Sequence, residues 1–297
     1  TMNWKMIVWL ASYPKSGNTW LRTIIGQFFE KDFNKDKVFE NSKKIRVYPS
    51  KIDYLEVDEI FNSKIYPQER KKEILDKTII NWSLTQSKIN LNENIYYFKT
   101  HNMLCKININ NKLYSFTNLE NTAGVIHIVR DPRNVLTSLK NHFSFKDDES
   151  ALKYMSNENQ TTGLDENNIP QFISSWKTHY NSWKRFPKNN LMIKYEDLLL
   201  DTKNQILRLI DYINNFTKIS ISNYDLNKII DNTSFENLKR LENQGKFDEN
   251  SMNNNTGEIN TFFNMGKKND WKIILNHNTR NLIEKKFKSE MLELGYL

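Results

Sequence analysis

One short segment near the start of the chain holds residue types that could bind a phosphate group. Lys15 supplies a positive charge, Ser16 and Thr19 supply hydroxyl donors, and Gly17 lets the backbone approach a ligand closely. If the segment leads from a strand into a helix, unpaired backbone N–H groups and the helix dipole also favour an anion. The same residues would suit an ordinary helix start with a solvated lysine, so the segment alone leaves both interpretations open.

The order of these residues argues against one class of nucleotide site. The usual loop of ATPases and GTPases places its lysine directly after the last glycine, followed by a hydroxyl that holds magnesium. Here Lys15 comes before Gly17. We therefore do not expect the standard magnesium–triphosphate arrangement.

Four short apolar runs predict the strands that position this segment. They are continuous rather than alternating, which is typical of a parallel sheet covered on both faces, and they span residues 7–11, 95–98, 125–129 and 191–193. Apolar residues at helical spacing follow, over residues 20–28, 135–143 and 206–213. This alternation predicts an α/β fold, a single doubly wound domain with a central parallel sheet, whose ligands bind beyond the carboxyl ends of the strands.

A second candidate anion site follows the third run. Arg130 ends the predicted strand, and Asp131 as N-cap with Pro132 in the first turn predicts that a helix begins there. Ser138 lies eight positions after Arg130 within that helix. This spacing allows the guanidinium and the hydroxyl to converge on one phosphate monoester.

The five histidines differ in their surroundings. His101 directly follows the run 95–98, which places it at the ligand edge of the sheet. His127 lies inside an apolar run and is expected to be a core residue. No spaced partner that would predict a metal site accompanies the remaining three, His142, His179 and His277.

These segments resemble the motifs of one enzyme family. Residues 13–21, Tyr-Pro-Lys-Ser-Gly-Asn-Thr-Trp-Leu, resemble the P-loop-like 5′-phosphosulfate loop of the sulfotransferases that use 3′-phosphoadenosine 5′-phosphosulfate (PAPS). Residues 128–138 resemble the 3′-phosphate motif of that family, and Lys99-Thr100-His101 resembles its catalytic histidine segment. Two matching motifs in the right order identify the family far more specifically than either motif alone. The resemblance is to the cytosolic-type sulfotransferase domain, and we expect a bacterial source.

The resemblance implies a role for each matching residue. His101 would deprotonate the acceptor, for which an ordinary imidazole pKa is suited. Lys15 would stabilise the leaving oxygen, and Arg130 with Ser138 would hold the 3′-phosphate. Lys99 would contact the sulfuryl oxygens, although a solvated lysine at a strand end remains the alternative. PAPS would be the donor and the bisphosphate PAP the product, with no metal.

Further positions complete the implied cofactor site. Trp20, Tyr195 and Phe235 match aromatic positions around the adenine, although each could equally be a core residue. The implied cofactor-binding set is Lys15, Ser16, Gly17, Asn18, Thr19, Trp20, Arg130, Ser138, Tyr195, Thr233, Phe235, Gly266 and Lys267.

The match near the C-terminus is incomplete. Residues 263–272 resemble the family segment Arg-Lys-Gly-x-x-Gly-Asp-Trp-Lys and keep its first glycine as Gly266. Asn264 and Met265 stand where the family has its Arg and Lys, and Asn269 replaces the second Gly. Lys267, or its neighbour Lys268, is the candidate to replace the lost charge.

We expect one domain over residues 2–297, with Thr1 preceding the first Met. Two polar or charged stretches, residues 31–94 and 144–169, interrupt the alternation and are expected to be acceptor-side insertions or lids. Residues 242–260 are expected to form a mobile loop. The family's short dimerisation motif is not evident after Lys272, so that dimer is not predicted.

Composition and charge leave several partners open. The 297 residues carry 43 Lys and Arg against 35 Asp and Glu, a formal charge of +8 that favours anionic partners. A single cysteine excludes a disulfide scaffold and favours a reducing compartment, here the cytoplasm, and no membrane span or signal is expected. The acceptor is expected to be a small molecule or lipid with a hydroxyl or amine. The rival interpretations are a P-loop nucleotide kinase using ATP and a basic nucleic-acid-binding module.

Overall fold

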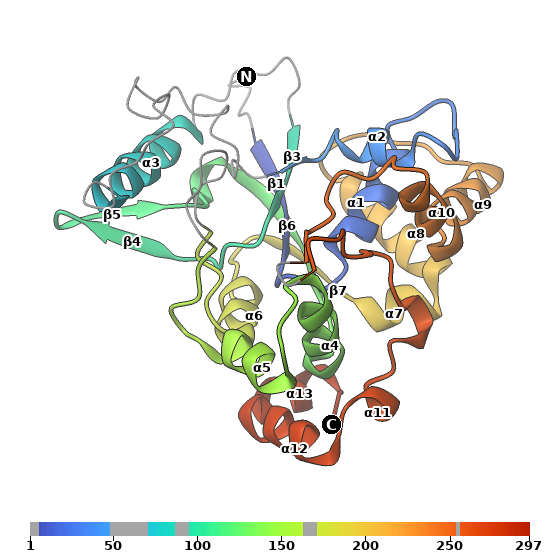
Figure 1. Ribbon diagram of the computed structural model, residues 1–297. Coiled ribbons are helices and arrows are strands. Elements are labelled where there is room, and N and C mark those ends of the chain that lie inside the picture. The colour runs from blue at the N-terminus through green and yellow to red at the C-terminus, as the bar shows by residue number, and fades with distance from the viewer. Residues whose placement is uncertain (1–5, 48–70, 87–94, 163–170, 254–255) are drawn as a thin grey trace.

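A five-stranded parallel sheet forms the centre of the computed structural model, which describes residues 6–47, 71–86, 95–162, 171–253 and 256–297 (Figure 1). The strands are β1 (Met6–Ser12), β2 (Arg46–Val47), β3 (Ile95–Thr100), β6 (Thr122–Val129) and β7 (Asn189–Lys194), in the order β2-β3-β1-β6-β7. The four predicted strands are confirmed. The sheet gains β2 at one edge, within a stretch that the sequence suggested was an insertion.

Strand β1 lies where the order of the strands reverses. It pairs with β3 on one side and with β6 on the other, so that Leu10 lies between Lys99 and Ile126. The loop after β1 therefore opens between the ends of two flanking strands, where ligands of such sheets bind.

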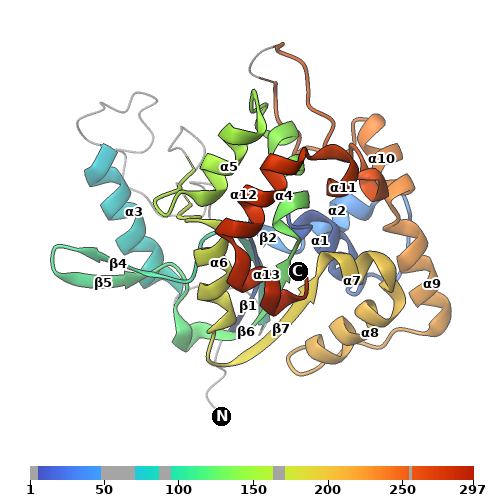
Figure 2. The same cartoon turned by 90° about the horizontal axis from the view of Figure 1, so that it is seen from below.

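Helices cover both faces of this sheet (Figures 1 and 2). One face packs against α1 (Asn18–Gln27), α8 (Thr202–Ile213) and α9 (Asn223–Asn232). The other packs against α3 (Lys71–Thr85), α4 (Pro132–His142), α5 (Asp148–Ser156), α6 (Trp176–Lys184), α12 (His277–Lys286) and α13 (Lys288–Leu294). The remaining elements are short: α2 (Val38–Ser42), the hairpin β4 (Lys106–Ile109) and β5 (Lys112–Ser115), α7 (Tyr195–Leu200), α10 (Phe235–Asn243) and α11 (Trp271–Ile274).

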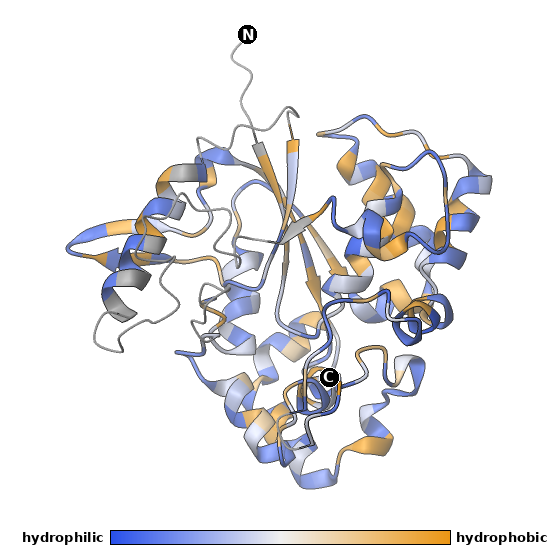
Figure 3. Cartoon of the chain, turned by 45° about the horizontal axis from the view of Figure 1, so that its top comes forward, coloured by the Kyte–Doolittle hydropathy of each residue, from blue (hydrophilic) through white to orange (hydrophobic). Residues whose placement is uncertain are grey.

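Apolar residues on alternate sides of β1 pack into two hydrophobic cores, one on each face of the sheet. Val8 and Leu10 face α1, whereas Ile7 and Trp9 face the side covered by α3 and α6. All four side chains are buried, and apolar colouring follows the central strands in Figure 3. Burial on both faces explains why the strands read as continuous apolar runs.

Two expectations need correction or qualification. Residues 144–169 include α5, whose Ala151 and Met155 are fully buried in the core, so this helix is a packing element rather than a lid. Residues 48–70, 87–94 and 163–170, parts of the two expected insertions, lie outside the described residues.

The helix start at Asp131 and Pro132 is confirmed, because the Asp131 carboxylate accepts a hydrogen bond from the Arg133 backbone N–H.

Arg133, in the first turn of α4, is buried. Its guanidinium donates to Asp131 at 2.7 Å and to Glu284 at 2.7 Å. We expect Arg133→Gln to lower the free energy of unfolding by about 3 kcal/mol, because it leaves the buried Asp131 carboxylate without its partner. Denaturant titration checks this, with Arg240→Gln as control: its pair with Asp36 is solvent-exposed and should contribute little to stability. Equal losses in the two variants would contradict the account.

Candidate functional site

The loop between β1 and α1 has the backbone geometry of an anion site. Lys15 has φ 64° and Gly17 φ 102°, both in the left-handed region. A Cβ on Gly17 would lie 2.6 Å from the ring of Tyr195, so only glycine fits there. Gly17 caps α1 with no side-chain bond, which leaves the first backbone N–H groups of the helix to a ligand.

Five cationic side chains line a cavity of about 760 Å³ beside this loop: Lys15, Arg22, Lys43, Lys99 and Arg130. Burial, then Arg130 and Lys99, lower the pKa of Lys15 to about 7. Burial, with Arg22 nearby, lowers the pKa of Lys99 to about 8. The buried Nε of Arg130 has no hydrogen-bond partner among the described residues. A multiply charged anion would satisfy this donor and relieve the repulsion among the cations, so the residues fit a phosphosulfate nucleotide.

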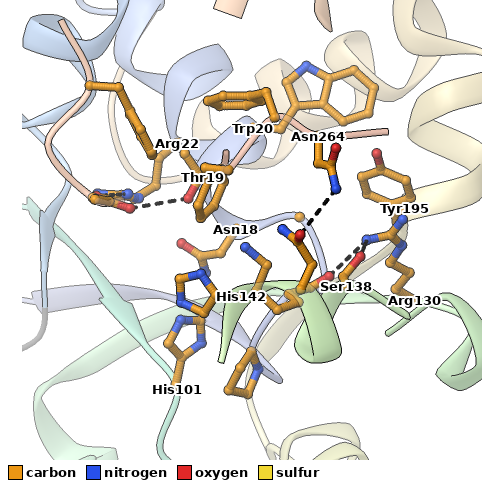
Figure 4. Close-up of a pocket in the computed structure, with 18 of the residues that line it drawn as sticks. Asn18, Thr19, Trp20, Arg22, His101, Arg130, Ser138, His142, Tyr195 and Asn264 are labelled. Carbon is orange, nitrogen blue, oxygen red and sulfur yellow. Dashed lines mark hydrogen bonds and ion pairs between the residues drawn. The ribbon is translucent and has the colours of Figure 1, made fainter. Parts of the chain in front are cut away.

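His101 lies at the end of β3 and lines the same cavity (Figure 4). Its Nδ1 is 2.8 Å from the backbone oxygen of Ser12, which can only accept, so Nδ1 carries the proton and Nε2 is left as the basic nitrogen. Burial, then Lys99, hold the pKa of His101 well below its usual range. The imidazole is therefore neutral at neutral pH and positioned as a base.

Arg130 and Ser138 meet as their spacing suggested. Arg130 Nη1 donates to Ser138 Oγ at 3.1 Å and to the backbone oxygen of Lys15 at 3.0 Å. The guanidinium also lies over the Tyr195 ring, 4.2 Å from its centroid. This side of the cavity is opposite Arg22 in Figure 4, so the charges lie at two separate places.

The aromatic candidates form one cluster. Trp20 and Tyr195 contact each other with centroids 5.6 Å apart, and the indole N–H of Trp20 donates to the backbone oxygen of Thr233 at 2.9 Å. Phe235 packs so closely on Gly266 that a Cβ there would lie 2.8 Å from the ring. Trp20, Tyr195, Phe235 and Gly266 line the cavity, together with Asn18 and Thr19.

Three members of the implied cofactor set do not line the cavity. Ser16 is fully buried behind it, and the Thr233 hydroxyl donates to the Ile229 backbone oxygen. Lys267 is exposed in the short turn Gly266–Lys268. The structure therefore does not bring Lys267 to the place of the missing Arg and Lys.

Amide side chains occupy that place instead. Asn269 Nδ2 donates to Ser138 Oγ at 3.0 Å, and its Oδ1 accepts from Thr137 Oγ1 at 2.6 Å. Asn264 Nδ2 donates to Asn141 Oδ1 at 3.2 Å. Arg130 therefore supplies the positive charge on this side of the cavity, amid neutral hydrogen-bonding groups.

Three residues that the sequence interpretation missed also line the cavity: Arg22, His142 and Glu249. Arg22 lies three positions after Thr19, so helical spacing could have indicated it. His142 ends α4, and its Nδ1 is 3.3 Å from Ser251 Oγ. Glu249 and Ser251 come from a loop far along the chain, for which no local signal exists.

The described part of residues 242–260 packs over the cavity. The Glu242 carboxylate accepts from the backbone N–H groups of Phe262, at 2.5 Å, and Phe263, at 3.0 Å. Lys15 Nζ lies 3.5 Å from the centroid of the Phe262 ring. The mobility expected of this loop stays a prediction.

The pKa of Lys15 predicts how ligand affinity depends on pH. Because an anion binds more tightly to the protonated amine, we expect the Kd for PAP to rise above pH 7, by up to about tenfold per pH unit for one linked proton. Calorimetry above pH 7, where phosphate ionisation is nearly complete, checks this. Lys15→Arg carries a side chain that stays charged over this pH range, so the Kd of this variant should depend less on pH. Only the smaller pH dependence due to Lys99 should remain. A wild-type Kd that stays constant with pH would contradict the account.

No described helix is long and apolar enough to cross a membrane. The described residues also contain no group of three or more His, Cys, Asp or Glu side chains that could hold a metal ion.

Known proteins resemble this chain over most of its length. Sulfotransferase 1E1 of Mus musculus is 22% identical, covering 95% of this chain and 82% of its own. Cytosolic sulfotransferase 8 of Arabidopsis thaliana is 24% identical, covering 96% and 78%. Among solved structures, mouse sulfotransferase SULT7A1 complexed with PAP has a TM-score of 0.57 at 17% identity, covering 97% and 84%. A retinol dehydratase complexed with androsterone and PAP has a TM-score of 0.57 at 18% identity, covering 96% and 80%.

The structural likeness shows that the fold is shared. A family model, the sulfotransferase domain, matches residues 6–295, which include the phosphosulfate loop, the histidine segment and the Arg130 motif. The chain belongs to the sulfotransferase domain family.

Proposed function

We propose that this sulfotransferase moves a sulfuryl group from PAPS to a hydroxyl or amine of a small-molecule or lipid acceptor, with His101 as the base. The observation that carries the proposal is the tautomer of His101, whose Nδ1–H donates to Ser12 and whose basic Nε2 remains for the acceptor. The same cavity holds the cations that an in-line transfer needs.

Each step has an assigned residue. The acceptor oxygen or nitrogen attacks sulfur while its proton passes to His101 Nε2. The bond between sulfur and the 5′-phosphate oxygen breaks, and Lys15 stabilises the negative charge on that leaving oxygen. Lys99 offsets charge on the sulfuryl oxygens. PAPS supplies the activated sulfuryl group when bound.

The cofactor is proposed to lie with its 5′ end at the loop before α1 and its 3′-phosphate at Arg130. The separation of Arg22 and Arg130 within one cavity (Figure 4) supports this orientation, because a bisphosphorylated nucleoside carries negative charge at both ends. Ser138, hydrogen-bonded to Arg130, adds a neutral donor. Trp20, Tyr195 and Phe235 are proposed to pack around the adenine.

The acceptor is proposed to have an apolar body. Aromatic and aliphatic side chains line much of the cavity that His101 also lines, among them Phe39, Phe143, Ile173, Phe247 and Phe262. The names of related proteins point the same way, since a retinol dehydratase was solved with retinol and a rabbit relative is an amine sulfotransferase.

Donor binding separates this proposal from a nucleotide kinase. We expect PAP to bind with release of heat and to raise the melting temperature by mass action, while ATP with magnesium has little effect. A response to ATP–magnesium alone would contradict the proposal. Oligonucleotide binding that weakens steeply with salt would instead support the basic nucleic-acid-binding module.

We also propose a cytoplasmic location. The single Cys105 gives no intramolecular disulfide, which suits a reducing compartment, and two plant relatives are named cytosolic sulfotransferases. Fractionation of cells that express the protein tests this proposal, and recovery from a secreted fraction would overturn it.

A further inference from the structure

Arg22 and Glu249 form an ion pair inside the cavity, beside the phosphosulfate loop. Arg22 is 2% exposed, and its Nη2 donates to Glu249 Oε1. Glu249 Oε2 accepts a second bond, at 3.3 Å, from the hydroxyl of Thr19. A carboxylate from a loop 230 positions away is thus held by a donor in the first turn of α1.

Charges around Glu249 are mainly positive. Burial alone would raise its pKa, but Lys99 and Arg22 outweigh burial and lower the pKa to about 2. Lys15 also lies near enough for its own pKa to respond to Glu249. Glu249 is therefore an anion surrounded by the cations assigned above to the 5′-phosphosulfate group.

Arg22 retains unused binding capacity. Its Nε is buried and has no hydrogen-bond partner among the described residues, although its Nη2 is paired. A guanidinium has five N–H donors in a planar fork and binds two oxygens of one oxyanion well. A tetrahedral phosphate or sulfuryl group can use this fork more completely than the single Glu249 oxygen does.

We propose that Arg22 is a binding residue for the 5′-phosphosulfate group and that the Glu249 carboxylate is its internal competitor. Both anions need Thr19, Arg22 and Lys99, so the donor binds only as Glu249 releases them. This inference rests on the proposed function. A purely structural ion pair predicts the opposite change in affinity. Removing a competing carboxylate tightens nucleotide binding, whereas removing a structural partner of Arg22 weakens it.

The test is PAP and PAPS affinity measured by titration calorimetry on the full chain. Glu249→Gln keeps the shape and removes the charge, and we expect its Kd for both nucleotides to fall by about five- to tenfold. Arg22→Gln should raise both values by about tenfold, since a hydrogen bond between charged groups is lost. Glu258→Gln makes the same change at an exposed site of the same loop and should leave both unchanged.

Stability is measured in parallel because Glu249→Gln leaves Arg22 unpaired. We expect the variant to melt at a lower temperature than the wild type without nucleotide, and PAP to raise its melting temperature more than it raises that of the wild type. In the double variant, Arg22→Gln with Glu249→Gln, no buried arginine is left unpaired. Its PAP affinity should exceed that of Arg22→Gln alone, because Thr19 and Lys99 are freed.

Two outcomes overturn the inference, and a third identifies a different failure. An unchanged or weaker PAP affinity in Glu249→Gln, repeated in the double variant, would make Glu249 a structural partner. An unchanged affinity in Arg22→Gln would remove Arg22 from the binding site. If the wild-type protein bound neither nucleotide, the proposed function itself would fail, and the competition with it.

Discussion

Replacing His101 with alanine should lower kcat by about a thousandfold, the middle of the range for a positioned general base, while PAP affinity stays within about twofold. The physical reason is the fixed tautomer: Nδ1 donates to the Ser12 backbone oxygen, so Nε2 is the atom that takes the acceptor proton. Alanine removes that atom without touching Lys15 or Arg130. Steady-state transfer from PAPS and calorimetry with PAP measure the two effects separately.

His277→Ala is the matched control, because His277 is exposed at the start of α12 and should change neither quantity. Unchanged turnover in His101→Ala would remove His101 as the base. A large loss of PAP affinity would instead show that the imidazole supports the cofactor site.

Replacing Arg130 with alanine should weaken PAP binding by about 30- to 100-fold, which corresponds to about 2–3 kcal/mol for a charge-assisted interaction. Arg130 supplies the positive charge beside Ser138, where Asn264 and Met265 provide none. Lys239 Nζ donates to the Asn264 backbone oxygen at 3.4 Å, but Lys239 does not line the cavity, so we expect no second cation to replace Arg130. Calorimetry with PAP measures the loss.

AMP distinguishes this binding role from a structural one, because it lacks the 3′-phosphate. Arg130→Ala should change AMP affinity by less than about threefold, which is well below the loss of affinity expected when one charged hydrogen bond is removed. Equal losses for PAP and AMP would mean that Arg130 shapes the loop through its bond to the Lys15 backbone oxygen. Arg130→Lys keeps the charge without the fork and should recover part of the affinity.

The fold was predictable where neighbouring residues in the sequence act together. Continuous apolar runs identified the four longer strands of the sheet, because strands buried on both faces carry no polar alternation. The two residues of β2 were missed, since a strand of that length has no period to detect. The burial of Arg133 could not be predicted from the sequence, because its partner Glu284 lies 151 positions away.

The candidate site likewise has one part that the sequence predicted and another that it did not. Its local motifs, around Gly17, His101 and Arg130, lie at strand ends that the sheet brings together. The contacts of Glu249 and Asn269 in the site could not be predicted from the sequence. Their partners, Thr19 and Ser138, lie 230 and 131 positions away. Such contacts depend on where loops cross the cavity, which periodicity does not encode.

The most direct test of the central claim is incubation of the wild-type protein with PAPS and a metabolite extract, followed by mass spectrometry. We predict a species that gains one sulfuryl group, with an equal amount of PAP formed, and far less of both products from His101→Ala over the same time. No sulfated species with PAPS, together with a phosphorylated species when ATP and magnesium replace it, would contradict the assignment.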